Sequence, residues 1–203
     1  MATFLSPTKG NLINLKKNLQ LSKLGFELMD KKRNILIREM MPLVEVAKTI
    51  RNDVEETFKK AYEALKMANL TLENCENIAE LTTVETGISI EYKSVMGIEI
   101  PKVTLNSNVT GREYGILNTN SHLDTAYFWF LKAKEISIIL AEIENSIYSL
   151  SKEIKETKIR ANALENIVIP KVEENIKYIS DALEEKEREE FSRLKIIKNR
   201  KTN

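Results

Sequence analysis

The stretch ISIILAEIENSIYSLSKEIKETKIRANALENIV, residues 136–168, decides the fold. Apolar or small residues recur in it with alternating spacings of four and three. A straight α-helix repeats about every 3.6 residues, so a stripe that repeats about every 3.5 stays on one side only in a left-handed supercoil. The stretch therefore predicts a coiled-coil helix. This C-terminal stripe consists of Ile136, Leu140, Ile143, Ile147, Leu150, Ile154, Thr157, Ala161, Leu164 and Val168.

A second stripe with the same spacing lies near the start of the chain. Two such stripes in one chain predict two helices that bury each other's apolar side, without a second chain. Alanines replace leucines toward its end, so the helices should approach more closely there. This N-terminal stripe consists of Leu12, Leu15, Leu19, Ser22, Phe26, Met29, Arg33, Leu36, Met40, Leu43, Ala47, Ile50, Val54, Thr57, Ala61, Ala64 and Ala68.

Each long helix contains a proline that should kink it without ending it, because the stripe continues beyond. We expect the first helix from about Thr8 to about Leu70, through Pro42. The last helix should begin with Ser121 as its cap and extend to about Lys198.

The second proline, Pro170, interrupts the last helix in the same way. Gly25, beside the N-terminal stripe, would let another backbone come close. Beyond Pro170 the C-terminal stripe resumes at Val172, Ile176, Ile179 and Leu183.

Between the helices, two short runs alternate with a period of two around the turn at residues 94–97, which predicts a β-hairpin. Pro101 lacks a donor, so its strand should be an edge. Residues 104–120 read as a loop. We also expect a short helix near Leu72, Ile78 and Leu81, and an aromatic cluster under the hairpin. The alternating residues are Ile88, Ile90, Tyr92, Ile98, Ile100 and Val103, and the cluster comprises Leu123, Tyr127, Trp129 and Phe130.

The composition suits long solvated helices better than a thick globular core, since 30 % of the 203 residues are charged and 6 % are aromatic. A formal net charge of +1 indicates no polyanionic partner. No run is long and apolar enough for a membrane span, and no signal peptide is evident. We therefore expect a mainly α protein: a long antiparallel left-handed coiled coil with a short β-hairpin and loop head.

The sequence predicts no catalytic, cofactor or metal site. The glycines form no phosphate-binding loop. His122, the only histidine, should lie at a helix terminus, and the only cysteine, Cys75, should be a half-buried filler without a basic neighbour. The acidic runs should be solvated helix faces.

Two segments resemble the D subunit of the vacuolar/archaeal-type rotary ATPases, the central rotor shaft. The first contains Pro7-Thr8-Lys9, Leu12, Leu15-Lys16, Leu19, Gly25, Leu28 and Lys31-Lys32-Arg33. The second contains Arg160-Ala161-Asn162-Ala163-Leu164-Glu165, Ile169-Pro170, Leu183-Glu184-Glu185, Glu187-Arg188-Glu189-Glu190-Phe191 and Arg193-Leu194-Lys195. Ala161 stands where a valine is common in that family, and Ile159 where an arginine is common.

The resemblance implies a non-catalytic central-stalk subunit that couples ATP hydrolysis or synthesis to proton or sodium transport. Residues 1–70 would be the N-terminal shaft helix, 71–120 the head and 121–203 the C-terminal shaft helix. The implied partners are the catalytic and regulatory nucleotide-binding subunits of a hexamer, the small F subunit of the rotor, and the subunit capping the membrane rotor ring. The chain would be cytoplasmic and peripheral to the membrane, and it would not bind nucleic acid.

Both chain ends are basic, and an antiparallel pair should bring them to one tip, with Leu15 close to Leu194. A basic tip suits an acidic bearing surface. The residues expected to contact partners are Lys9, Lys16, Lys17, Arg160, Lys195 and Lys198.

Two other interpretations remain open at this point. A coiled-coil scaffold or adapter would self-associate through the stripes. The central subunit of the mitochondrial/bacterial-type ATPase is also a helical hairpin, but residues 71–120 are too short for the larger α/β domain of that family.

Overall fold

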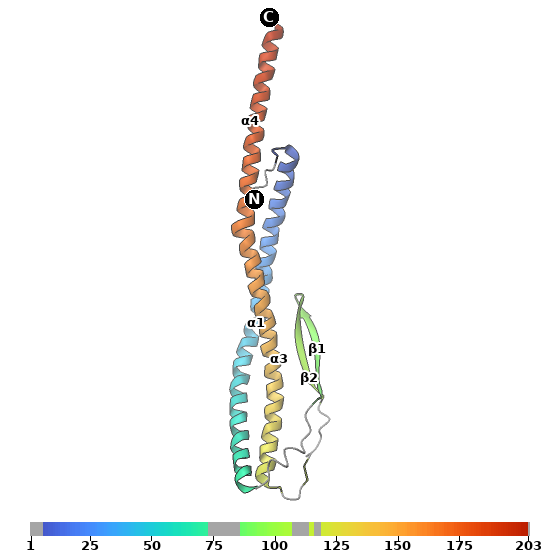
Figure 1. Cartoon of the computed structure of the whole chain (residues 1–203), viewed down its shortest axis with the longest axis vertical. Coiled ribbons are helices and arrows are strands. Elements are labelled where there is room, and N and C mark those ends of the chain that lie inside the picture. Colours follow the sequence, from blue (N-terminus) through green and yellow to red (C-terminus); the bar gives the residue numbers. More distant parts are fainter. Residues whose placement is uncertain (1–5, 73–85, 107–113, 116–118, 203) are drawn as a thin grey trace. The chain divides into compact units, whose positions relative to one another are not determined.

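A computed structural model describes residues 6–72, 86–106, 114–115 and 119–202, with side chains to residue 200. The described elements are helix α1 (Lys9–Thr71), strands β1 (Ile88–Val95) and β2 (Ile98–Leu105), helix α3 (Ser121–Ala163), the π-helical turn η1 (Leu164–Val168) and helix α4 (Ile169–Thr202) (Figure 1). The chain forms two compact units. Unit 1 is Met1–Asn34 with Lys155–Asn203, and unit 2 is Ile35–Ile154.

In unit 1, the first part of α1 packs antiparallel to the helix of residues 155–202. Two ion pairs, Lys9–Glu187 and Lys23–Glu173, each at 2.8 Å, show this direction. From the first pair to the second, the residue number rises along α1 and falls along the other helix, as in an antiparallel pair. Both pairs are exposed and add little stability. The stripes supply the packing, and their buried residues in this unit are Leu15, Thr157, Ala161 and Ile179.

In unit 2, the second part of α1 packs antiparallel to α3. Arg51 pairs with Glu144 across the two helices, and the rings of Tyr62 and Phe130 meet edge to face at 5.5 Å. The alanine-rich end of the N-terminal stripe is buried here, as a closely packed helix pair requires. The buried apolar side chains on the two helices are Leu36, Ala47, Ala61, Ala68, Ala126, Ala133 and Leu150.

The stripes are buried as predicted. Every position of the N-terminal stripe is buried or half-buried, and so is every position of the C-terminal stripe except Val168, which is 36 % exposed. Helix α1 starts and ends within a residue of the expected bounds and passes through Pro42 without interruption. At its start, the hydroxyl of Thr8 accepts a hydrogen bond from the amide of Asn11 at 3.3 Å and so caps the helix.

The last helix differs from the expectation at Pro170. In place of a simple kink, the five residues Leu164–Val168 form a π-helical turn between α3 and α4. The amide of Ile169 donates to the carbonyl of Leu164, five residues back instead of the four of an α-helix.

Gly25 also differs from the expectation. A Cβ atom built on it would lie 3.8 Å from Leu164 Cδ1, which is ordinary van der Waals contact. The packing of the two helices therefore does not require a glycine here.

The β-hairpin is confirmed, with a tighter turn than predicted. Strands β1 and β2 pair antiparallel from Ile88 opposite Leu105 to Val95 opposite Ile98. Met96 (φ 53°) and Gly97 (φ 81°) make the two-residue turn in the left-handed region, which matches the strand twist.

The hairpin is tied to α3 through one edge. The backbone amide of Val103 on β2 donates to Glu142 Oε2 at 2.9 Å. Pro101, two residues away on the same strand, points its nitrogen to the same outer side, so its missing donor costs no bond to β1. On strand β1, the side chains of Ile90 and Tyr92 are exposed to solvent.

The residue that caps helix α3 lies one position earlier in the sequence than predicted. The carbonyl of Asn120, and not the Ser121 side chain, accepts the first amides, those of Leu123 and Asp124. Asp124 also accepts the Tyr114 hydroxyl at 2.7 Å. The buried Tyr114 is thereby joined to the start of α3.

The predicted aromatic cluster under the hairpin was wrong in composition. Its members are divided among separate neighbours: Tyr127 meets the ring of Tyr114, Phe130 meets Tyr62, and Trp129 meets Phe128. Three expectations fall wholly or largely outside the described residues. They are the part of the short helix that follows Leu72, the environment of Cys75, and most of the loop at 104–120.

Replacing Gly25 with alanine should stabilise the protein by about 0.5–1 kcal/mol, because alanine is the better helix former and the site has room for its methyl group. Urea unfolding of the purified chain measures the change. Gly10→Ala, in the first turn of α1, is the matched control and should change stability less. A loss of stability in Gly25→Ala would show that the helices are closer than described.

Replacing Glu142 with alanine should release the hairpin edge while the helices persist. Loss of a hydrogen bond to a charged acceptor predicts about tenfold faster hydrogen exchange at the Val103 amide. Glu142→Gln keeps a side-chain oxygen as acceptor and should lose less protection. Equal exchange rates at the Val103 amide in the unmodified chain and in both variants would contradict a hydrogen bond between Val103 and Glu142.

Candidate functional site

The most exposed part of the described chain is the end of α4. Every residue from Glu184 to Arg200 is exposed, and we call this segment the α4 end. It continues past the start of α1, whose first residue, Lys9, pairs with Glu187 (Figure 1). At about 1.5 Å per residue, the 13 residues beyond Glu187 extend about 20 Å without the neighbouring helix.

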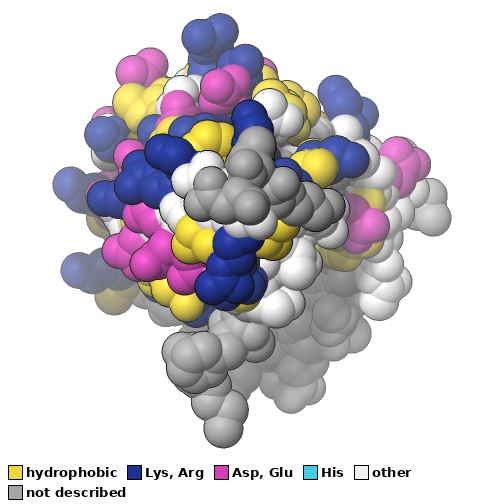
Figure 2. Space-filling view, turned by 90° about the horizontal axis from the view of Figure 1, so that it is seen from above, with side chains coloured by type: hydrophobic (Ala, Val, Ile, Leu, Met, Phe, Trp, Pro, Cys, Tyr) yellow, Lys and Arg dark blue, Asp and Glu magenta, His cyan; other side chains and the backbone are white. Residues whose placement is uncertain are grey.

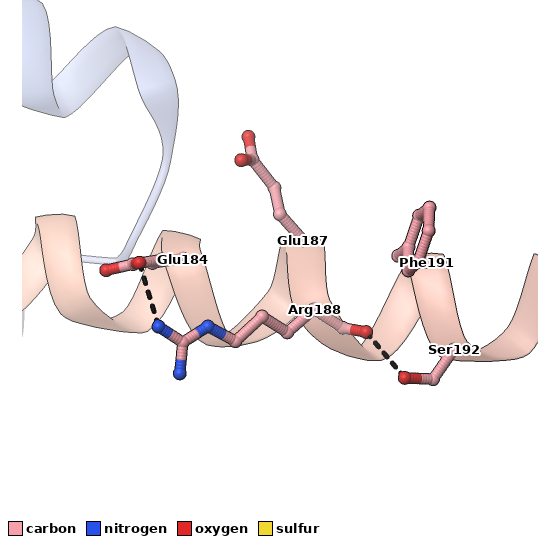
Figure 3. A pocket seen from close by; sticks show the side chains of 5 residues that line it. All are labelled: Glu184, Glu187, Arg188, Phe191 and Ser192. Carbon is pink, nitrogen blue, oxygen red and sulfur yellow. Dashed lines mark hydrogen bonds and ion pairs between the residues drawn. The ribbon is translucent and has the colours of Figure 1, made fainter.

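The α4 end keeps its helical form through contacts within the helix. Arg188 donates to Glu184 at 2.9 Å, and the Ser192 hydroxyl donates to the Arg188 carbonyl at 2.9 Å (Figure 3). Arg193 and Glu189 approach to 3.7 Å at the same spacing. Such pairs four residues apart each support a helix by a few tenths of a kcal/mol.

Large apolar side chains project from the α4 end beside basic ones. Phe191 is 71 % exposed and Leu194 64 %. Seen from above, the visible face carries dark blue basic, magenta acidic and yellow apolar side chains intermixed (Figure 2). Apolar side chains this exposed, on a segment that none of the described helices covers, are typical of a surface that binds a partner. The residues of this surface are Phe191, Leu194, Ile196 and Ile197, with Arg193, Lys195, Lys198 and Arg200.

A groove of about 440 Å³ lies where α1 begins beside α4. The ion pair of Lys9 and Glu187 lies at this groove. The hydrogen bond and the charge of Glu187 raise the pKa of Lys9, and the same contact lowers the pKa of Glu187. The groove is lined by Lys9, Leu12, Ile13, Ser180, Leu183, Glu184 and Glu187.

The structure separates the residues predicted to contact partners. Lys195 and Lys198 lie on the α4 end, whereas Lys16 and Lys17 are exposed about two turns along α1 from Lys9. Arg160 lies far from the α4 end in sequence and pairs with Glu156 on its own helix at 3.1 Å.

The prediction that the basic residues of both chain ends share one tip, with Leu15 close to Leu194, was therefore wrong. The register of Lys9 with Glu187 and Lys23 with Glu173 places Leu15 opposite about residue 181. Leu194 is then about 20 Å farther along the helix, at about 1.5 Å per residue.

Sequence reasoning overlooked the exposed apolar residues of the α4 end. The signal was present: Phe191, Leu194 and Ile197 follow one another at spacings of three, on one side of a helix. Only the start of α1 at Lys9 shows that none of the described helices covers them.

No group of three or more His, Cys, Asp or Glu side chains in the described residues is placed to hold a metal ion. His122 is exposed in the first turn of α3, near Trp129, whose ring lies 5.4 Å from Lys60 Nζ and 5.3 Å from Lys132 Nζ. Within the described ranges, no helix is both long and apolar enough to cross a membrane.

The Lys9–Glu187 pair should hold the first turn of α1 across neutral pH. A lowered carboxylate pKa gives stability above its ordinary value of 4.5 that is lost as the pH falls through the folded value. A raised lysine pKa gives stability below 10.5 that is lost as the pH rises through the folded value. Both groups are exposed, so the effect is small and weakens with salt.

Glu187→Gln should therefore speed hydrogen exchange in the first turn of α1 at neutral pH and low salt, but not at a pH where Glu187 is protonated. Glu185→Gln is the matched control, because Glu185 lies about 200° around the helix from Glu187. A difference that persists unchanged at acid pH would contradict the ion pair as the cause.

Comparison with known proteins places this helical pair in a family. The family model for the D subunit of ATP synthase matches residues 11–199. The V-type ATP synthase D subunit of Thermotoga neapolitana is 44 % identical over 198 residues, covering 97 % of this chain and 98 % of that protein. The A-type ATP synthase D subunits of Methanosphaera stadtmanae and Pyrococcus furiosus are 35 % and 34 % identical, each over 96 % of this chain and 93 % of theirs.

The match includes both stripes, the hairpin and most of the α4 end, so it covers the elements described above and not one motif alone. The chain belongs to the family of ATP synthase D subunits.

Proposed function

We propose that this chain is the central rotor shaft of a V/A-type ATP synthase, a non-catalytic subunit that couples ATP hydrolysis or synthesis to ion transport. The observation that supports this most directly is the α4 end. Here a helix that none of the described helices covers carries apolar and basic side chains on its surface, which suits it to insertion into a surrounding protein socket.

In this proposal, unit 1 enters the bore of a hexamer of catalytic and regulatory nucleotide-binding subunits. An asymmetric helix pair contacts each interface of such a ring differently. Its orientation therefore favours a different nucleotide state at each interface, and rotation moves the preference around the ring. The chain needs no catalytic residue for this role, because its differential contacts carry the coupling.

Charge supports the choice of partner surface. At the α4 end, Arg193, Lys195 and Arg200 follow the mixed segment around Glu187 and Glu190, so the last turns are the basic ones. We propose that they face acidic groups of the hexamer. Contacts through Lys9, Lys16, Lys17, Arg160, Lys195 and Lys198 belong to the same proposal.

Unit 2 would lie outside the hexamer, where the small F subunit of the rotor and the subunit capping the membrane ring bind. The exposed strand β1 and the surface around Trp129 leave room for such partners. The chain would thus be peripheral to the membrane, on the cytoplasmic side, as part of the complex.

The scaffold alternative has less support. It required stripes free to associate with another chain, but the described stripe residues of each unit pack against a helix of the same chain. The α4 end instead offers exposed apolar surface where a shaft would meet its bearing.

Truncation of residues 193–203 tests the shaft proposal in the reconstituted membrane complex. We expect ATP-driven ion transport to fall more than ATP hydrolysis, because the lost turns position the shaft and perform no chemistry. The measurement is the ratio of ions transported to ATP hydrolysed, in vesicles with known complex content.

Two full-length variants separate the causes. One replaces Phe191, Leu194 and Ile197 with serine, and the other replaces Arg193, Lys195 and Arg200 with alanine; the size and helical length of the chain are kept. An unchanged transport ratio in the truncation and in both variants would overturn the bearing role. Failure of the tagged full-length chain to co-purify with nucleotide-binding subunits would overturn the shaft proposal itself.

A further inference from the structure

The π-helical turn η1 coincides with a one-residue change in the register of the C-terminal stripe. Before it, the stripe follows alternating spacings of four and three to Leu164. Continued without change from Leu164, that spacing would select Val168 and then Lys171, Asn175, Tyr178 and Ala182.

The structure buries the residues one position later. Ile179 is fully buried at 0 % exposure, whereas Tyr178 is 61 % exposed. The half-buried Val172, Ile176 and Leu183 share the side of Ile179. Of the positions in the unshifted repeat, Lys171 is exposed, and Asn175 and Ala182 are half-buried at the border of this side. The sequence therefore holds one residue more than the repeat allows between Leu164 and Val172.

A π-helical turn accommodates one such residue. Its hydrogen bonds reach back five residues in place of four, so it takes up one residue without rotating the helix beyond it. In an unbroken α-helix the extra residue would rotate the following surface by about 100°, since a turn holds about 3.6 residues. The exposed Ile167 (65 %) and Val168 (36 %) mark the place where the turn widens away from the partner helix.

We propose that η1 is a register-correcting turn: it absorbs an inserted residue so that the end of α3 and α4 present one continuous apolar side to α1. The inserted residue, and not Pro170, is the cause of the π form. The turn thereby sets which side of α4 faces α1 beyond Val168, and with it the direction in which the α4 end presents Phe191 and Leu194.

The competing explanation is the proline. Pro170 has no amide hydrogen for the carbonyl of Asn166, and prolines are a common cause of helix distortion. The two explanations differ in what they predict for deletion of the extra residue and for replacement of the proline, so both variants are needed.

The test uses the purified full chain and a zero-length carbodiimide, which joins a lysine to a carboxylate in direct contact. Lys23–Glu173 and Lys9–Glu187, each at 2.8 Å, lie beyond η1 and report the register of α4 against α1. Mass spectrometry identifies each cross-link, and thermal unfolding followed by circular dichroism reports stability.

Deletion of Ile167 should keep both cross-links and keep or raise the unfolding midpoint, because it restores the uninterrupted repeat. Pro170→Ala should also keep both cross-links, since the extra residue remains. Deletion of the exposed Ser180, which lies between the two reporters in a regular part of α4, is the matched control. It should keep Lys23–Glu173, lose Lys9–Glu187 and lower the midpoint.

Loss of both cross-links on deletion of Ile167, or a fall in midpoint as large as that of the Ser180 deletion, would overturn the proposal. Loss of the cross-links in Pro170→Ala would assign the π form to the proline. These outcomes concern the chain alone, so they are independent of whether the shaft proposal holds in the complex.

Discussion

Burial of two long apolar stripes is the constraint on which this structure depends. A helix of the length of α1 with one apolar side is stable in water only when another helix covers that side. In each unit a neighbouring helix of the same chain does so, and the fully buried Leu36, Leu150 and Ile179 show where the packing is tightest. The cross-helix ion pairs fix direction and register but are too exposed to supply the stability.

The same constraint accounts for the irregular features. A repeat of about 3.5 residues tolerates no extra residue unless the backbone absorbs it, and η1 lies at the point where the stripe changes register. The prolines illustrate the contrast. Helix α1 passes through Pro42 with its stripe in register, whereas the segment before Pro170 is π-helical. A proline in a long helix is thus compatible with either outcome, and the surrounding register distinguishes them.

The candidate surface arises because the two helices end at different places. The polar and charged side chains of the α4 end hold it as a helix through contacts four residues apart, and no α1 residue lies beside its last turns. In a family of ATP synthase subunits, an exposed helical end with apolar and basic residues gives the proposed shaft a defined region of contact. The hairpin is joined to α3 in a different way: at its edge, the backbone amide of Val103 donates to the carboxylate of Glu142.

The sequence by itself determined the helical class, the bounds of α1, the hairpin and the family, because periodicity and residue identity are local properties. It also located both stripes, since burial follows their spacing. Tertiary structure alone decided the rest. The register between helices depends on which turns meet, so the distance from Leu15 to Leu194 and the bare α4 end could not be read from either stripe separately. The aromatic side chains likewise found their neighbours across elements, as Phe130 did with Tyr62, because packing in three dimensions and not proximity in sequence selects the contacts.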